Sequence, residues 1–514
     1  MAKEHHYGLS SSTGKWTLGA CIIASSMAFI DTSALNVVLP SLQEDLNATG
    51  TDLFWVLNSY LVMLSSLIIV GGSLGDKLGR VKIFQWGIIL FTVSSILCGI
   101  STSIDQLIWF RILQGTGGAF MIPGSLAIIS ATFSDQEKGK AIGTWSAATV
   151  LVTMGGPILG GALADIGLWR LIFFINVPLG VICAIVLYLK VPESKAPENK
   201  HRIDWKGAFF LAFSLATFTF GFLNIPELGI SDVKSFIPLI IGVISFLLFL
   251  YVEKRVNAPM MPLGIFKNMT FSGVNLLTFF LYAGLSAVML FLSLNMIQIQ
   301  GYTQMQAGLT FLPFTILMAL IARRVGSLSD KWGARNFLIG GPIVTAVGFL
   351  ALGLVGKTSG IEEFWGTFFP GILLFGLGMS LTVVPLTSTV MQSIGNDRAG
   401  IASGVNNSIT RISGTFINAV LGAGAVYFFS LLVSNEIETL QVSKQIANSI
   451  IEESINFGEA KVPSDVASNN IGAVEQIYTS SFITAYRWVC YISAVMAFLA
   501  SGFAFFMVKE PSKK

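Results

Sequence analysis

The chain has 514 residues, of which 53% are hydrophobic and only 11% are charged. An ordinary soluble domain carries roughly 25% charged residues, and a soluble core cannot enclose so much apolar surface. The composition therefore excludes a water-soluble globular protein and predicts a polytopic, all-α membrane protein. The net charge of +3 is too small to indicate nucleic acid as a partner.

Fourteen apolar segments are each long enough to cross a bilayer as a helix. We expect the spans at about 16–39, 54–75, 84–104, 107–131, 139–164, 170–190, 207–226, 235–252, 271–299, 305–328, 337–355, 364–389, 400–433 and 482–508.

The charges between these segments predict the orientation of the chain. The short odd-numbered connections hold only two basic residues, Lys234 and Lys357, whereas one even-numbered connection alone holds five between positions 190 and 206. Because basic loops stay on the cytoplasmic side, both termini are expected to be cytoplasmic.

One short stretch occurs twice. "GGSLGDKLGRVK" covers residues 71–82, and "GSLSDKWGAR" covers residues 326–335. Each copy follows the second span of a six-span set, so we predict two parallel halves, 1–190 and 271–514. Residues 191–270 then form linkers around two extra spans, about 207–226 and 235–252, which we expect to lie peripherally.

The residue types suit a tight turn between two helices. Gly72, Gly75 and Gly79 permit a tight reversal. Asp76 can accept from backbone N–H groups or from an arginine at a helix end, and Arg80 can hold the loop at the anionic cytoplasmic leaflet. Asp330 is the matching acid of the second copy. The alternative is a charged turn that only fixes topology.

The longest connection, 434–481, is expected outside the cell. Ile446, Ile450, Ile451 and Ile455 recur at helical spacing, which predicts a short amphipathic helix. A solvated loop containing some helix is the simpler interpretation, and a partner-binding surface is the other.

Asp31 is the acidic residue that we place deep in a span. A charge there costs about 2.5–3.5 kcal/mol to insert, so the side chain should face the bundle interior. Loss of solvation favours the neutral form of a carboxylate, which suits a group that binds and releases a proton. A hydrogen-bonded structural aspartate is the alternative.

Arg111 is the expected counter-charge of Asp31. Arg111, Gln114, Gly115 and Gly118 share one face of a helix, which gives the fourth span a polar stripe. An arginine that snorkels toward the cytoplasmic end is the alternative interpretation.

The fifth span contains Gly156, Pro157, Gly160 and Gly161. Gly156 and Gly160 form a G-x-x-x-G step that lets another helix approach closely, while the proline bends the segment. Ordinary glycine-rich packing would leave the same pattern.

Polar residues of the second half are candidates for a substrate cavity. Tyr282 and Asn295 lie in the ninth span, and Asn407 and Arg411 are i, i+4 neighbours in the thirteenth. With Gln114, they would suit a large amphipathic substrate, although asparagine and arginine also join helices to one another.

Five motifs in chain order resemble those of a known family. "GSLGDKLGR" (72–80) is similar to the loop signature of the major facilitator superfamily, and fourteen spans resemble its drug:proton antiporter branch. "DTSALNVVLP" (31–40), "RILQGTGGA" (111–119), "GPILGG" (156–161) and "WRLIFFINVPLG" (169–180) resemble motifs of the first, fourth, fifth and sixth spans.

The resemblance implies a proton-driven exporter of small amphipathic compounds that works by alternating access. It gives Arg111 a part in proton translocation, and the fifth-span motif favours efflux over uptake. The resemblance also gives the loop signature a gating role. The second loop copy departs from the pattern at Ala334, where the first has Arg80 directly after its glycine, so its gating role is less well supported.

No enzyme signature is present. The chain has no G-x-x-x-x-G-K-[ST] loop for ATP hydrolysis, and its three histidines are scattered in polar segments, so we predict neither cofactor nor metal. A multi-pass, monomeric protein of the cell membrane is expected, with protons and lipids as partners. An exporter of an endogenous lipid or metabolite remains an alternative, as does a non-transporting sensor or assembly protein.

Overall fold

The computed structural model describes residues 7–194, 204–257, 259–394, 399–440 and 442–509. Side chains of a few helical residues within these ranges, Asp330 among them, are not described. The described chain is helical, and its one β-type pairing is an isolated bridge between Tyr7 and Phe133. Fourteen of its helical segments are long and apolar enough to cross a membrane, which confirms the predicted number of spans.

The helices up to residue 255 have the following bounds: α1 Ser12–Leu46, α2 Gly50–Leu78, α3 Arg80–Gly99, α4 Ile104–Thr132, α5 Asp135–Asp165, α6 Leu171–Phe174, α7 Asn176–Lys190, α8 Trp205–Leu223, α9 Ile225–Leu228 and α10 Val233–Arg255.

The remaining elements are η1 Leu263–Lys267, α11 Met269–Leu294, the π-helical turn η2 Asn295–Ile299, α12 Gln304–Leu309, α13 Leu312–Trp332, α14 Ala334–Gly353, η3 Ile361–Glu363, α15 Phe368–Ser393, α16 Ala399–Ile437, α17 Lys444–Glu453, η5 Ser454–Glu459 and α18 Ile471–Met507.

Several helix ends differ from those expected. Helix α1 continues through Pro40 to Leu46 instead of ending near 39, and α18 begins at Ile471 instead of 482. Hydropathy detects only the apolar part of a helix, whereas the helix itself continues as long as its backbone hydrogen bonds form. Gly72 and Gly75 belong to the last turns of α2, so of the three glycines expected in the turn only Gly79 lies there.

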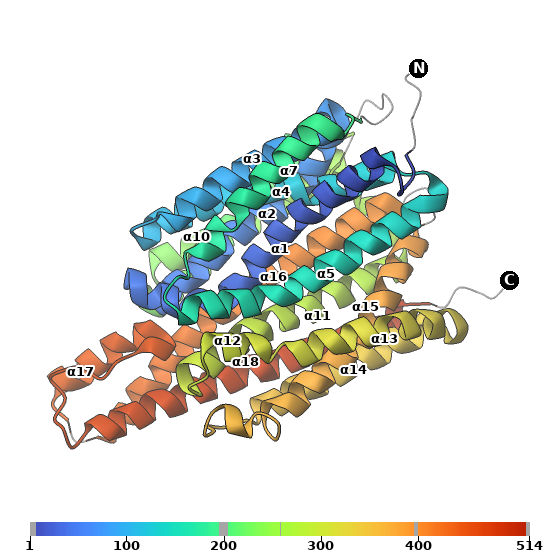
Figure 1. Ribbon diagram of the computed structural model, residues 1–514. Helices are drawn as coiled ribbons and strands as arrows, with labels where there is room; N and C mark the ends of the chain where they lie inside the picture. The colour runs from blue at the N-terminus through green and yellow to red at the C-terminus, as the bar shows by residue number, and fades with distance from the viewer. Residues whose placement is uncertain (1–6, 195–203, 258, 395–398, 441, 510–514) are drawn as a thin grey trace. The chain divides into compact units, whose positions relative to one another are not determined.

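The chain packs into two units. The first comprises residues 1–38, 56–216 and 242–262, and the second comprises 39–55, 217–241 and 263–514. Within the first unit α3 packs against α4 and α7. Within the second, α14 packs against α15 and α18, and α11 against α16 and α18 (Figure 1).

Helix α10 is the least enclosed of the fourteen candidate spans. Only 22% of the residues in the most apolar stretch of α10 are buried, against 72% in α2. A helix with apolar residues on all sides and few protein neighbours is stable where those sides meet lipid. Helix α10 therefore has the character of a lipid-facing helix.

The segment between α16 and α18 is built into the second unit. Helix α17 confirms the predicted short helix, and its Ile450 is buried and accepts a hydrogen bond from the Tyr478 hydroxyl at 2.8 Å. Phe457 packs its ring against Phe291 and Phe482. At least one face of the segment between α16 and α18 is thus covered by residues of α11 and α18.

Polar contacts join this segment to residues 39–55 within the same unit. The Gln43 amide donates to the carbonyl of Asn456 at 2.9 Å, and Gln298 donates to Gln43 at 3.2 Å and to Glu459 at 3.3 Å. Burial raises the pKa of the Glu459 carboxyl.

Candidate functional site

A buried ion pair joins α1 to α4 in the first unit. Arg111 of α4 donates from Nη1 to Asp31 Oδ2 of α1 at 2.5 Å, and both residues are only 1% exposed. The other carboxylate oxygen, Oδ1, accepts from Gln114 Nε2 at 2.8 Å. Because both oxygens accept N–H donors, the arrangement suits an ionised carboxylate.

Arg111 is held from several directions. Its Nη1 also donates to Gln114 Oε1 at 2.7 Å, and its Nε donates to the carbonyl of Val56 at 3.3 Å. The guanidinium carbon lies 4.3 Å from the centre of the Tyr60 ring, which gives a cation–π contact. Arg111 therefore does not snorkel in this structure, because its charged end is enclosed by protein.

The polar cluster extends to α3 and α7. Gln114 Nε2 and Asn176 Nδ2 both donate to Ser95 Oγ, at 3.2 and 3.0 Å, and Ser95 donates to the carbonyl of Phe173 at 3.0 Å. The fourth-span and sixth-span motifs thus meet at Ser95, one hydrogen bond away from the partner of Asp31, Gln114. Gln114, predicted for a substrate cavity, is fully buried inside this cluster.

The sequence did not identify three members of the cluster. Asn176 lies within the "WRLIFFINVPLG" stretch, so the motif was visible although the residue was not singled out. Nothing in the sequence marks Tyr60 and Ser95 as members of a polar cluster, since tyrosine and serine are ordinary residues in membrane helices.

The glycines of the fifth-span motif bring α5 against α1 beside Asp31. A Cβ added at Gly156 would collide with the Ser33 side chain, and one added at Gly160 would lie 2.9 Å from Ala34 O and 3.0 Å from Ala34 Cα. Pro157 and Gly161 are buried in the same helix. The motif therefore sets the distance between the two helices at the level of the carboxylate.

The turn that joins α2 to α3, hereafter the α2–α3 turn, has Gly79 at its centre, Asp76 in the last turn of α2 before it and Arg80 at the start of α3 after it. Arg80 Nε contacts Asp76 Oδ1 at 2.7 Å, and the Asp76 side chain is 48% exposed. Gly79 has a φ of +121°, which an L side chain rarely adopts. In the second copy Asp330 lies on α13, but its side chain is outside the described part of the chain.

The four cavity candidates of the second half do not form one cluster. Tyr282 of α11 and Arg411 of α16 are close enough to interact electrostatically. Asn295 is fully buried and accepts a hydrogen bond from Gln300 at 3.4 Å, whereas Asn407 is exposed on α16. Only the first two are brought together.

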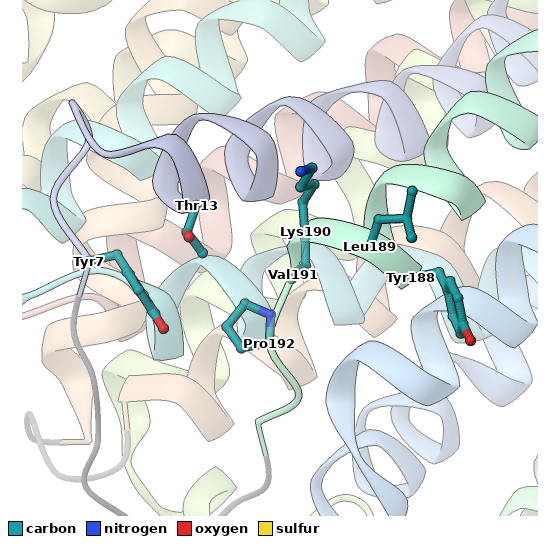
Figure 2. Close-up of a pocket in the computed structure, with 7 residues that line it drawn as sticks. All are labelled: Tyr7, Thr13, Tyr188, Leu189, Lys190, Val191 and Pro192. Atoms are coloured by element: carbon teal, nitrogen blue, oxygen red, sulfur yellow. The ribbon is translucent and has the colours of Figure 1, made fainter.

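A small pocket of about 270 Å³ opens in the first unit between the N-terminal segment and the end of α7 (Figure 2). It is lined by Tyr7, Thr13 and residues 188–192, which include no acidic group. Sites for drug-sized ligands are enclosed and usually about 300–1,000 Å³, so this open pocket is a poor candidate. Among the described residues, no three His, Cys, Asp or Glu side chains gather to hold a metal ion.

Comparison with known proteins agrees with this architecture. The family model described as Major Facilitator Superfamily matches residues 21–418. A relative named tetracenomycin C resistance and export protein, from Streptomyces glaucescens, is 27% identical over 97% of this chain and 92% of its own length. The multidrug resistance protein Stp of Mycobacterium tuberculosis is 32% identical over 86% of this chain and 82% of its own.

Solved structures show the same fold. A bacterial homologue of the human lysosomal transporter Spinster, in an inward-facing and unoccupied conformation, matches with a TM-score of 0.66. The match has 17% sequence identity and covers 98% of this chain and all of the other.

The fourteen candidate spans, the family model and the relatives define a membrane transport protein. The chain belongs to the Major Facilitator Superfamily. It is a multi-pass transporter of the cell membrane and not an enzyme.

Proposed function

We propose that the chain exports small amphipathic compounds in exchange for protons that enter the cell, and that one chain suffices because it contains both halves. The observation that carries the proposal is the Asp31–Arg111 pair, a titratable carboxylate paired with a buried arginine inside the helical bundle. Export as the direction of transport is supported by the names of the relatives, which are resistance and export proteins.

The ion pair can couple the entry of protons to the export of the substrate through a change of charge. A proton on Asp31 neutralises the carboxylate and removes most of its attraction for Arg111. The arginine, still charged and cut off from water, then gains from any rearrangement that gives it another partner or solvent. Because α1, α2 and α4 all contact these two side chains, such a change acts on three helices at once.

Transport into proteoliposomes with an imposed pH gradient tests the proposed proton exchange. The same assay tests how the charge of the substrate affects its transport. Arg111 would repel a multiply charged cation at low dielectric once its pairing with Asp31 is lost, and one deep carboxylate cannot balance two charges. We expect neutral, zwitterionic or monocationic amphipaths to be transported and matched dications to be transported poorly. Flux that is independent of the pH gradient would refute proton exchange, and equal flux of the dications would refute the charge rule.

Asp76→Asn is expected to shift the balance between inward- and outward-open states. The variant loses the ion pair with Arg80, and since such an exposed pair is worth up to about 1 kcal/mol, the populations should change by about two- to fivefold. Cysteine labelling from both faces measures the shift. Asp105→Asn, which changes an exposed carboxylate in the first turn of α4, is the matched control, and equal labelling of both variants would contradict a gating role.

A further inference from the structure

Glu193 is bound to the α2–α3 turn, although 111 residues or more separate it from its partners. It stands three residues after the end of α7 at Lys190. Its Oε1 accepts from the backbone N–H of Val81 at 2.9 Å, and its Oε2 accepts from that of Lys82 at 3.0 Å. The N–H of Arg80 donates to the carbonyl of Ser194 at 2.9 Å.

These contacts supply what the start of α3 lacks. The first N–H groups of a helix have no partner within the helix, and the residue before α3, Gly79, has no side chain to accept from them. Residues 193 and 194 provide acceptors for three successive N–H groups. The carboxylate also places negative charge at the positive end of the helix dipole.

The turn and the carboxylate fit one another sterically. A Cβ added at Gly79 would lie 2.8 Å from the carboxyl carbon and from Oε2 of Glu193. Glycine is thus required there for two reasons, its positive φ and the room that it leaves for Glu193.

The second half joins its corresponding turn to its last helix with different chemistry. Gly333 again has a positive φ, of 87°, before α14. Arg335 donates from Nη2 to the carbonyl of Phe505, near the end of α18, at 2.7 Å, and its guanidinium lies 5.3 Å from the centre of that ring. The second copy of the motif has Ala334 where the first has Arg80, and its arginine follows one position later. That arginine, Arg335, binds the end of the last helix.

We propose that Glu193 is a positioning residue for transport, which anchors the α2–α3 turn to the end of α7 so that both move as one piece. The inference rests on the gating role proposed for this turn. Both donors from the turn to the Glu193 carboxylate are backbone N–H groups, so Glu193 fixes the path of the main chain, whereas the Asp76–Arg80 pair joins two side chains.

Hydrogen exchange of the full-length protein measures the anchor directly. Loss of a helix cap typically changes local stability enough to speed exchange between about 2- and 30-fold. We expect exchange at residues 80–83 to rise by about fivefold in Glu193→Ala and by less in Glu193→Gln, which keeps one carbonyl oxygen as acceptor. Glu475→Ala, which removes an exposed glutamate in α18, is the control and should leave these residues unchanged.

Flux of the monocation ethidium in proteoliposomes tests the consequence for transport. We expect Glu193→Ala to lower the maximal rate with an unchanged apparent KM, and Glu193→Gln to recover part of that rate. Unchanged exchange at 80–83, or faster exchange with an unchanged maximal rate, would overturn the inference. If the unmodified protein moved no amphipath, the proposed function would fail, while the exchange measurement would still decide whether Glu193 anchors the turn.

Discussion

Asp31→Asn is expected to abolish transport driven by a pH gradient. Asparagine fills the same space but cannot bind and release a proton at physiological pH. The substitution also leaves Arg111 without its counter-charge at a site that is 1% exposed. Flux of a monocationic amphipath into proteoliposomes, measured with and without the gradient, checks the result.

The same ion pair makes a second variant necessary. Removing one partner of a buried pair typically costs about 3–5 kcal/mol, because the other charge remains buried without compensation. Asp31→Asn should therefore also lower stability, and lost flux alone would not separate coupling from folding. In the double variant Asp31→Asn with Arg111→Gln both charges are absent, so we expect stability to recover substantially while coupled flux stays absent.

Stability can be followed by the reaction of the buried cysteines with a thiol reagent on heating, since Cys21, Cys98 and Cys183 are all enclosed in the first unit. Proton-coupled flux in either variant at the parent's rate would refute the role of Asp31. Recovery of coupling in the double variant would do the same, because it would show that the single variant failed through the unpaired arginine.

The number of spans and the pairing of Asp31 with Arg111 were both accessible from the sequence. Both follow from the free-energy cost of placing polar groups in hydrocarbon. Because of this cost, membrane spans are apolar segments, and a charged acid inside a span is stable only when it pairs with a base. The roles of these residues in coupling remain predictions.

Other features of the site leave no pattern in the sequence. Glu193 binds backbone N–H groups, and every residue except proline has one, so no residue type identifies its partners. The carbonyl of Val56, which accepts from Arg111, is likewise a backbone group that no residue type identifies. The ends of α1 at Leu46 and of α18 at Ile471 lie beyond the apolar stretches, where hydropathy no longer follows the helix.

Gly160→Ala is expected to destabilise the first unit and to stop transport. The new Cβ would lie 2.9 Å from both Cβ and O of Ala34 and 3.0 Å from its Cα. Since main-chain atoms of α1 cannot rotate away, the helices α1 and α5 must separate next to Asp31. Inserting one methylene group into a packed contact typically costs about 1–3 kcal/mol, which we expect as an earlier thermal exposure of the buried cysteines.

Three other glycines of α5 make the test specific. At Gly156 the closest obstacle is the Ser33 hydroxyl, a side-chain end that can change rotamer, so Gly156→Ala should cost less than Gly160→Ala. A Cβ at Gly155 or Gly143 meets nothing within 4 Å, and alanine is the better helix former by about 1 kcal/mol. These two variants should be as stable as the parent or more so, with transport retained. If all four variants lost transport equally, flexibility of α5 would matter and not its contact with α1; if Gly160→Ala matched the parent, close approach at Ala34 would not be required.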